Sequence, residues 1–77
     1  MSDEGRELGV MEKSGGHLIR VTESNYEGHD LVDVRVYYSD ENGTLKPTRK
    51  GIAVRREQFG DFVDLLMEAR EKLNGRT

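Results

Sequence analysis

Alternating apolar and polar residues along the first two thirds of the chain predict β-strands, because successive side chains of a strand point to opposite faces. The pattern is clearest where Val32, Val34 and Val36 form an apolar row separated by polar residues. Ile19 and Val21 share one face of another such segment. The predicted strands are 7–13, 17–26, 31–39 and 49–54.

Glycine-rich and polar segments separate these strands and predict tight turns at 14–16, 26–29 and 40–43. Asn and Gly in the third turn favour the positive φ that a hairpin needs. Pro47 has no amide hydrogen for a ladder, so we expect it at a sheet edge or in a loop. An antiparallel sheet with one apolar and one polar face follows from this pattern.

The last third of the chain has apolar residues at helical spacing, which predicts one helix over 57–73, with Asn74-Gly75 as its C-cap. The apolar stripe covers about 200°, whereas a helix that packs on one neighbour needs only somewhat more than about 100°. We therefore expect one flank to contact the chain's own sheet and the other to contact a second copy. The predicted dimer-interface residues are Phe59, Phe62, Val63, Leu66 and Met67.

The composition supports a homodimer independently. Seventy-seven residues form one domain, here with 34% hydrophobic residues and no cysteine. A domain this small buries little surface and usually needs a disulfide, a metal or a partner subunit. We predict an α+β homodimer in which residues 1–6 are flexible and residues 7–77 form a four-stranded antiparallel sheet followed by one helix.

The net charge of −3 argues against general attraction to polyanions. The acidic excess lies at the two ends, however, because residues 17–56 contain seven basic and six acidic side chains. The segment 31–54 is densest in basic and aromatic residues. These are Arg35, Tyr37, Tyr38, Lys46, Arg49 and Lys50.

Cations that neutralise phosphates and aromatic rings that stack on bases are what sequence-tolerant single-strand binding requires. Arg20 either extends this basic face or lies on an exposed strand. Tyr37 shares a face with Arg35 by alternation but Tyr38 does not, so stacking by Tyr38 requires a twist or bulge near Ser39. The alternative is that these residues are ordinary strand aromatics beside a solvated charged loop.

Nothing in the sequence has the pattern of a catalytic or metal site. It has no phosphate-binding glycine loop and no nucleophile elbow. His17, His29, Asp30 and Asp33 lack the spacing of metal ligands, and Asp33 is expected to pair with a neighbouring cation. We predict a protein that is not an enzyme and needs no metal or cofactor.

Three segments resemble the single-stranded-DNA-binding domain of the transcriptional coactivator positive cofactor four. They are Asp33–Tyr38, Gly43–Ile52 and Glu57–Phe59, in the same order and at compatible spacing. The resemblance implies a curved sheet, a homodimer formed through helix and sheet, and binding of single-stranded DNA with little sequence preference. By position, Arg35, Lys46 and Lys50 correspond to the family's DNA-contacting basic residues. Tyr26 and Tyr38 stand where the family has base-stacking aromatic residues.

The sequence departs from the family at Glu27 and His29, where the coactivator has lysines, and it lacks the coactivator's serine- and lysine-rich arm. Two alternatives therefore stay open: a protein-interaction dimer with weak or lost DNA binding, and an RNA-binding variant. The expected partners are single-stranded DNA or RNA, a second copy of the chain and the transcription machinery. With no apolar segment long enough for a membrane span, we expect a soluble protein, cytoplasmic or nucleoid-associated in a bacterium and nuclear in a eukaryote.

Overall fold

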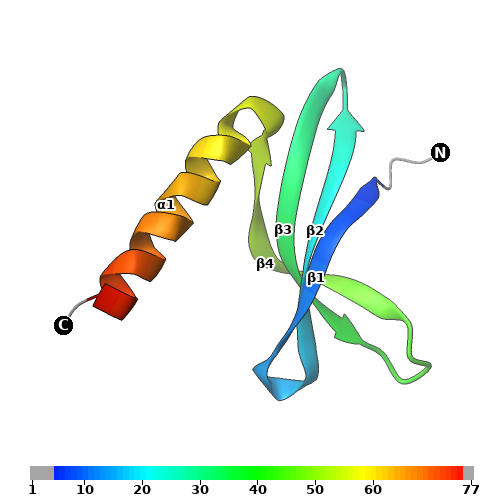
Figure 1. The fold of residues 1–77 in the computed structure, drawn as a ribbon. Helices are drawn as coiled ribbons and strands as arrows, with labels where there is room; N and C mark the ends of the chain where they lie inside the picture. The colour runs from blue at the N-terminus through cyan, green and yellow to red at the C-terminus, as the bar shows by residue number, and fades with distance from the viewer. Residues whose placement is uncertain (1–4, 76–77) are drawn as a thin grey trace.

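Four strands and one C-terminal helix follow one another along the chain (Figure 1). The computed structural model describes residues 5–75. Its elements are β1 (Arg6–Lys13), β2 (His17–Tyr26), β3 (His29–Ser39), β4 (Leu45–Arg55) and α1 (Arg56–Gly75), with a single 3₁₀ turn at Ser14–Gly16 between β1 and β2. This order confirms the predicted α+β fold. Most of the segment predicted to be flexible, residues 1–4, lies outside the described residues, whereas Arg6 already belongs to β1.

The strands form a single antiparallel meander in the order β1-β2-β3-β4. β1 and β4 are therefore the edges of the sheet. The predicted start of the fourth strand at residue 49 was wrong, because pairing already begins at Leu45. Pro47 is accommodated because β4 has no neighbour on its outer side, so its missing amide hydrogen breaks no ladder bond there.

β4 carries a bulge opposite the middle of β3. Arg35 pairs with Gly51 and Tyr37 pairs with Pro47, so Val36 alone faces residues 48–50. Beyond this point the β3–β4 hairpin continues to the pair Ser39–Leu45, whereas the β2–β3 ladder ends at Leu18–Tyr37. The β1–β2 and β3–β4 hairpins consequently diverge at one end of the sheet (Figure 1).

The two faces of the sheet differ as the alternation predicts. Val32, Val34 and Val36 share one face with Ile19 and Val21 of β2, with which Val36 and Val34 are paired. The helix α1 contacts β3 and β4. Only Val32, at 3% exposure, is a buried apolar residue within residues 5–75. One chain by itself therefore has almost no interior.

The single chain is also more extended than a compact domain of its size. Its radius of gyration is 14.4 Å, against about 11.5 Å expected for 77 residues. Its accessible surface is 6064 Å², against about 4,800 Å² expected for its mass. Figure 1 shows the reason, since α1 runs alongside the sheet and slants away from it. Within residues 5–75, no helix is both long and apolar enough to cross a membrane.

Candidate nucleic-acid interface

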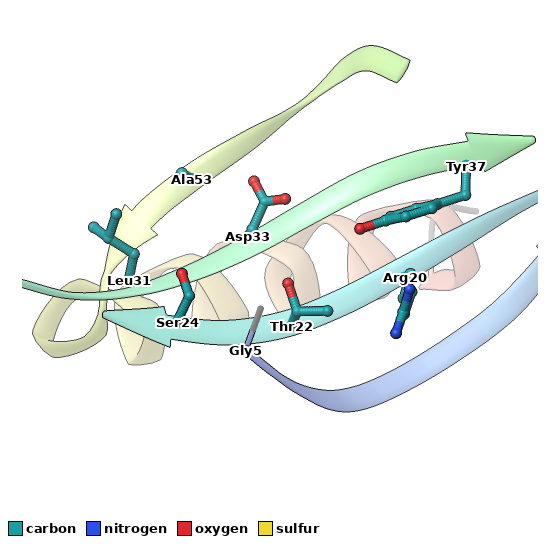
Figure 2. A pocket seen from close by; sticks show the side chains of 8 residues that line it. All are labelled: Gly5, Arg20, Thr22, Ser24, Leu31, Asp33, Tyr37 and Ala53. Carbon is teal, nitrogen blue, oxygen red and sulfur yellow. The ribbon is translucent and has the colours of Figure 1, made fainter. Parts of the chain in front are cut away.

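The polar face of the sheet contains a shallow trough of about 360 Å³ (Figure 2). It lies over β2 and β3, with Ala53 of β4 and Gly5 at its borders. Its other lining residues are Arg20, Thr22, Ser24, Leu31, Asp33 and Tyr37. Three hydroxyl groups and two opposite charges therefore face solvent on this side of the sheet.

Arg20 and Tyr37 lie together at one end of the trough. The guanidinium carbon of Arg20 is 5.1 Å from the centre of the Tyr37 ring, within the range of a cation–π contact. Arg20 Nε also donates to Glu7 Oε1 at 3.0 Å. Tyr37 is thus covered on one side by Arg20, and the charge of Arg20 is already balanced by a carboxylate of β1.

Asp33 and Arg35 form a forked ion pair on the same face of β3. Arg35 Nε donates to Asp33 Oδ2 at 2.9 Å, and Arg35 Nη2 donates to Asp33 Oδ1 at 2.8 Å. These hydrogen bonds raise the pKa of Arg35 above its ordinary value, so the guanidinium stays charged wherever the protein is folded. The expectation that Asp33 pairs with a neighbouring cation is confirmed.

The β4 bulge presents cations that are not paired in this way. Arg49 and Lys50 are exposed and have no ion pair within residues 5–75. Lys46, near the start of the same strand, is half exposed, and its Nζ lies 3.7 Å from Asp40 Oδ2. Of the basic residues predicted for the site, Arg49 and Lys50 are therefore the ones whose charge is free to meet a phosphate.

Two exposed tyrosines lie toward opposite ends of the sheet. Tyr26 is 63% exposed and pairs with His29 across a two-residue turn, in which Glu27 and Gly28 have φ of 54° and 83°. Tyr38 is 40% exposed and pairs with Lys46. At about 3.3 Å per residue, the nine steps along β3 from His29 to Tyr38 span about 30 Å.

These tyrosines lie on different sides of the sheet. Tyr26 pairs with His29, which shares the trough face with Asp33 and Arg35 by alternation. β3 runs without interruption against β2 up to Tyr37, so Tyr38 falls on the face of Val34 and Val36. The irregularity that stacking by Tyr38 would require near Ser39 is absent from β3, because the bulge is in β4 and opposite Val36.

The structure thus brings together some of the predicted residues and separates others. Arg20, Arg35 and Tyr37 share the trough face, and Arg49 and Lys50 follow next to Arg35 on β4. The predicted site did not include Thr22 and Ser24 of the trough, nor Thr48, whose carbonyl accepts from Arg35 Nη1 at 3.1 Å. The two-residue period places Thr22 and Ser24 on the face of Arg20, but it does not mark their hydroxyl groups as site residues. Thr48 depends on the bulge register, for which the sequence has no signal.

Within residues 5–75, no three His, Cys, Asp or Glu side chains gather as a metal site would require. The trough itself is polar, open and close to neutral, because its Arg20 and Asp33 each have a partner of opposite charge. Uncharged polar groups, such as nucleobases and sugar hydroxyls, would therefore fit this trough better than bound ions.

The fold and this face define an α+β protein with a four-stranded antiparallel meander, one C-terminal helix, and cations on the sheet. Residues 13–65 match the sequence profile of the family described as Transcriptional Coactivator p15 (PC4). The chain belongs to this family.

Individual relatives agree with this assignment. The crystal structure of a PC4 homolog from Burkholderia pseudomallei is similar with a TM-score of 0.82 and 32% identity, covering 94% of this chain and 97% of that one. A bacteriophage T5 homolog of PC4 shares the fold, with a TM-score of 0.56 and 22% identity over 92% of this chain and 84% of the other. A Caenorhabditis elegans protein that carries the name of an RNA polymerase II transcriptional coactivator is 34% identical over 58 residues, 74% of this chain. The chain spans about half the length of that curated relative, because the match covers 47% of it.

Proposed function

We propose that this protein is a homodimer that binds single-stranded DNA with little sequence preference and acts in transcription, replication or repair. Membership of the PC4 family supports the DNA-binding role. The name of the Caenorhabditis elegans relative supports transcription. The bacteriophage homolog is implicated in recombination-dependent DNA replication, which keeps replication and repair within the proposal.

The observation that carries the proposal is the combination of free cations and exposed rings on one open sheet. Arg49 and Lys50 have no acidic partner within residues 5–75, and Tyr26 is 63% exposed. Phosphates neutralised by such cations release counterions, and bases stacked on such rings gain about 1–3 kcal/mol each. Neither contact depends on the identity of the base.

The exposed surface supports the homodimer. The chain exposes about 1,300 Å² more than a compact protein of its mass, whereas each partner in a standard interface buries about 800 Å². Leu65, Leu66 and Met67 of α1 are each more than half exposed. A second copy that covers these side chains would supply the core that one chain lacks.

Removal of the free cations tests the DNA-binding role. The variant with both Arg49→Ala and Lys50→Ala should bind a fluorescent oligo-dT more weakly at low salt. Its log-log salt slope should be shallower by about 1.4, because each phosphate contact contributes about 0.7. The matched control is Lys72→Ala, which removes a charge from the 77%-exposed side chain of Lys72 on α1. An unchanged slope in the double variant would contradict the proposal.

A second candidate is a protein-interaction dimer with weak DNA affinity, and the ion-pair pattern favours it. Most basic side chains of residues 5–75 are already paired with carboxylates; those without a pair are Lys13, Arg49, Lys50 and Arg70. Intact partner binding by the variant with Arg35→Ala and Lys50→Ala, together with no DNA binding by the wild type, would favour this candidate.

A further inference from the structure

The guanidinium of Arg35 is committed to the protein rather than presented to solvent. Three of its N–H groups donate at 2.8 to 3.1 Å, two to the carboxylate of Asp33 and one to the carbonyl of Thr48. The side chains of Arg35 and Asp33 are only 24% and 21% exposed. A phosphate could take this guanidinium only after displacing a forked carboxylate, which is its best geometric partner.

The contact with Thr48 is at the start of the bulge that carries the free cations. Thr48 Oγ1 donates to the carbonyl of Val36 at 2.8 Å, and the amide of Lys50 donates to Thr48 Oγ1 at 3.1 Å. Asp33, Arg35, Thr48 and Lys50 are therefore linked by consecutive hydrogen bonds. We call these residues and their bonds the bulge clamp.

The bulge needs such a clamp because regular pairing is interrupted there. β4 is an edge strand, so residues 48–50 have β3 on one side and no strand on the other. Pairing resumes only at Gly51, which approaches β3 so closely that a Cβ would lie 2.5 Å from the carbonyl oxygen of Val34. Without the clamp, the backbone that presents Arg49 and Lys50 would be held only at its two ends.

We propose that Asp33 and Arg35 are positioning residues for nucleic-acid binding: they fix the carbonyl of Thr48 and thereby hold Arg49 and Lys50 in the arrangement that meets successive phosphates. This inference rests on the proposed single-strand binding. It assigns a role to the acidic residue Asp33, and it gives Arg35 a role through the bulge instead of a direct phosphate contact.

The substitution Asp33→Asn distinguishes direct phosphate binding by Arg35 from positioning of the bulge, because the two roles predict opposite changes in DNA affinity. If Arg35 binds phosphate directly, removal of the carboxylate frees the guanidinium, takes a negative charge from the site and strengthens binding. If Arg35 positions the bulge, the same substitution loosens Thr48 and weakens binding. We expect oligo-dT binding to weaken about threefold to tenfold, as is typical of coupled residues.

The matched control is Asp64→Asn, which removes the same charge from an exposed side chain of α1. It should leave binding unchanged or slightly stronger. Stronger binding by Asp33→Asn than by Asp64→Asn would overturn the clamp.

The salt slope distinguishes positioning from a general decrease in folded protein. Arg35→Lys keeps the charge but cannot bridge Asp33 and Thr48 with a fork. The clamp predicts a slope shallower by about 0.7 for each phosphate that Arg49 or Lys50 no longer neutralises. A slope equal to that of the wild type would overturn the clamp, because a direct charge contact or a smaller folded fraction leaves the slope unchanged.

Two further measurements test the bulge clamp separately from DNA binding itself. In the background of Arg49→Ala and Lys50→Ala, the effect of Asp33→Asn on binding should disappear, since nothing is left to position. Without any DNA, Asp33→Asn should speed amide hydrogen exchange at Lys50 relative to Asp64→Asn. Failure of the wild type to bind single strands would contradict the proposed function, whereas unchanged exchange at Lys50 would contradict the clamp itself.

Discussion

Val32 and Tyr26 differ widely in side-chain exposure in a protein that covers little of its sheet. Val32 is the one apolar side chain within residues 5–75 that the chain buries on its own, at 3% exposure. Tyr26 is at the other extreme, with 63% of its surface exposed next to a tight turn. The first serves stability, and we assign the second to binding because a large exposed ring leaves apolar area in water without packing against anything.

Substitution of Val32 by Ala should lower the free energy of unfolding by about 1–3 kcal/mol, because it removes two buried methyl groups and leaves a cavity. Urea denaturation followed by circular dichroism measures this change. The matched control is Val10→Ala at a side chain that is 50% exposed, where we expect a change within about 0.5 kcal/mol. Equal effects at the two positions would contradict the packing described for β3.

Substitution of Tyr26 by Ala should weaken oligo-dT binding by about 1–3 kcal/mol, the contribution of one stacked base. Tyr26→Phe keeps the ring and should bind like the wild type. Anisotropy titrations of both variants at one salt concentration measure the difference. If Tyr26→Phe reduces affinity as much as Tyr26→Ala, then the hydroxyl rather than the ring makes the contact, and the stacking role is wrong.

At the scale of elements, β4 determines the character of the site. It is an edge strand with an internal bulge, and it carries Lys46, Arg49 and Lys50 in one stretch. Bulges at sheet edges bend a strand and redirect its side chains. The close approach of Gly51 to β3 fixes where the bulge ends, since Val34 and Arg35 leave no room for a Cβ there.

Gly51→Ala should therefore destabilise the protein by about 1–3 kcal/mol, as overpacking does, because β4 has to move away from β3. Gly9→Ala is the matched control in β1, where an added Cβ meets nothing within 4 Å. Thermal unfolding should separate the two variants. Equal midpoints would show that β4 does not approach β3 as closely as described.

The elements were predictable to the extent that they depend on local pattern. Alternation located β2 with its observed bounds and α1 within two residues at its C-terminal end, because buried faces impose a period of two or 3.6. The start of β4 was not predictable, since Pro47 opposes strand formation locally and only the pairing with Tyr37 overrides it. The same holds for the site. Asp33 was expected to pair with a neighbouring cation, and Arg35, two residues away on the same face of β3, is that cation. Thr48 joins them through a bulge that depends on the register of two strands.

At the scale of the whole molecule, one chain leaves a large apolar surface uncovered. It exposes Leu65, Leu66 and Met67 on α1, and its radius of gyration exceeds that of a compact domain. The proposed phosphate-binding track would also be short in one chain, because its bulge offers only Arg49 and Lys50 as unpaired cations within residues 5–75. A dimer would cover the exposed apolar side chains of α1 and double the number of unpaired bulge cations.

Light scattering at micromolar concentration should give twice the chain mass of 8.8 kDa. Leu66→Glu should shift the mass toward that of one chain, because a charge on the predicted interface would be left buried and unpaired. Glu68→Lys changes an exposed side chain that lies about 160° around α1 from Leu66, and it should leave the dimer intact. A monomeric mass for the wild type would contradict the homodimer.

The most direct test of the central claim is competition among single-stranded DNA, duplex DNA of the same sequence and single-stranded RNA for a labelled oligo-dT, at two salt concentrations. We predict that single-stranded DNA displaces the label at lower concentration than duplex DNA does, because only unpaired bases can stack on exposed rings. Binding should weaken at the higher salt, with a slope near −0.7 per phosphate neutralised. Displacement by duplex DNA as strong as by single strands, or an affinity indifferent to salt, would contradict the account, and stronger displacement by RNA would make RNA the ligand.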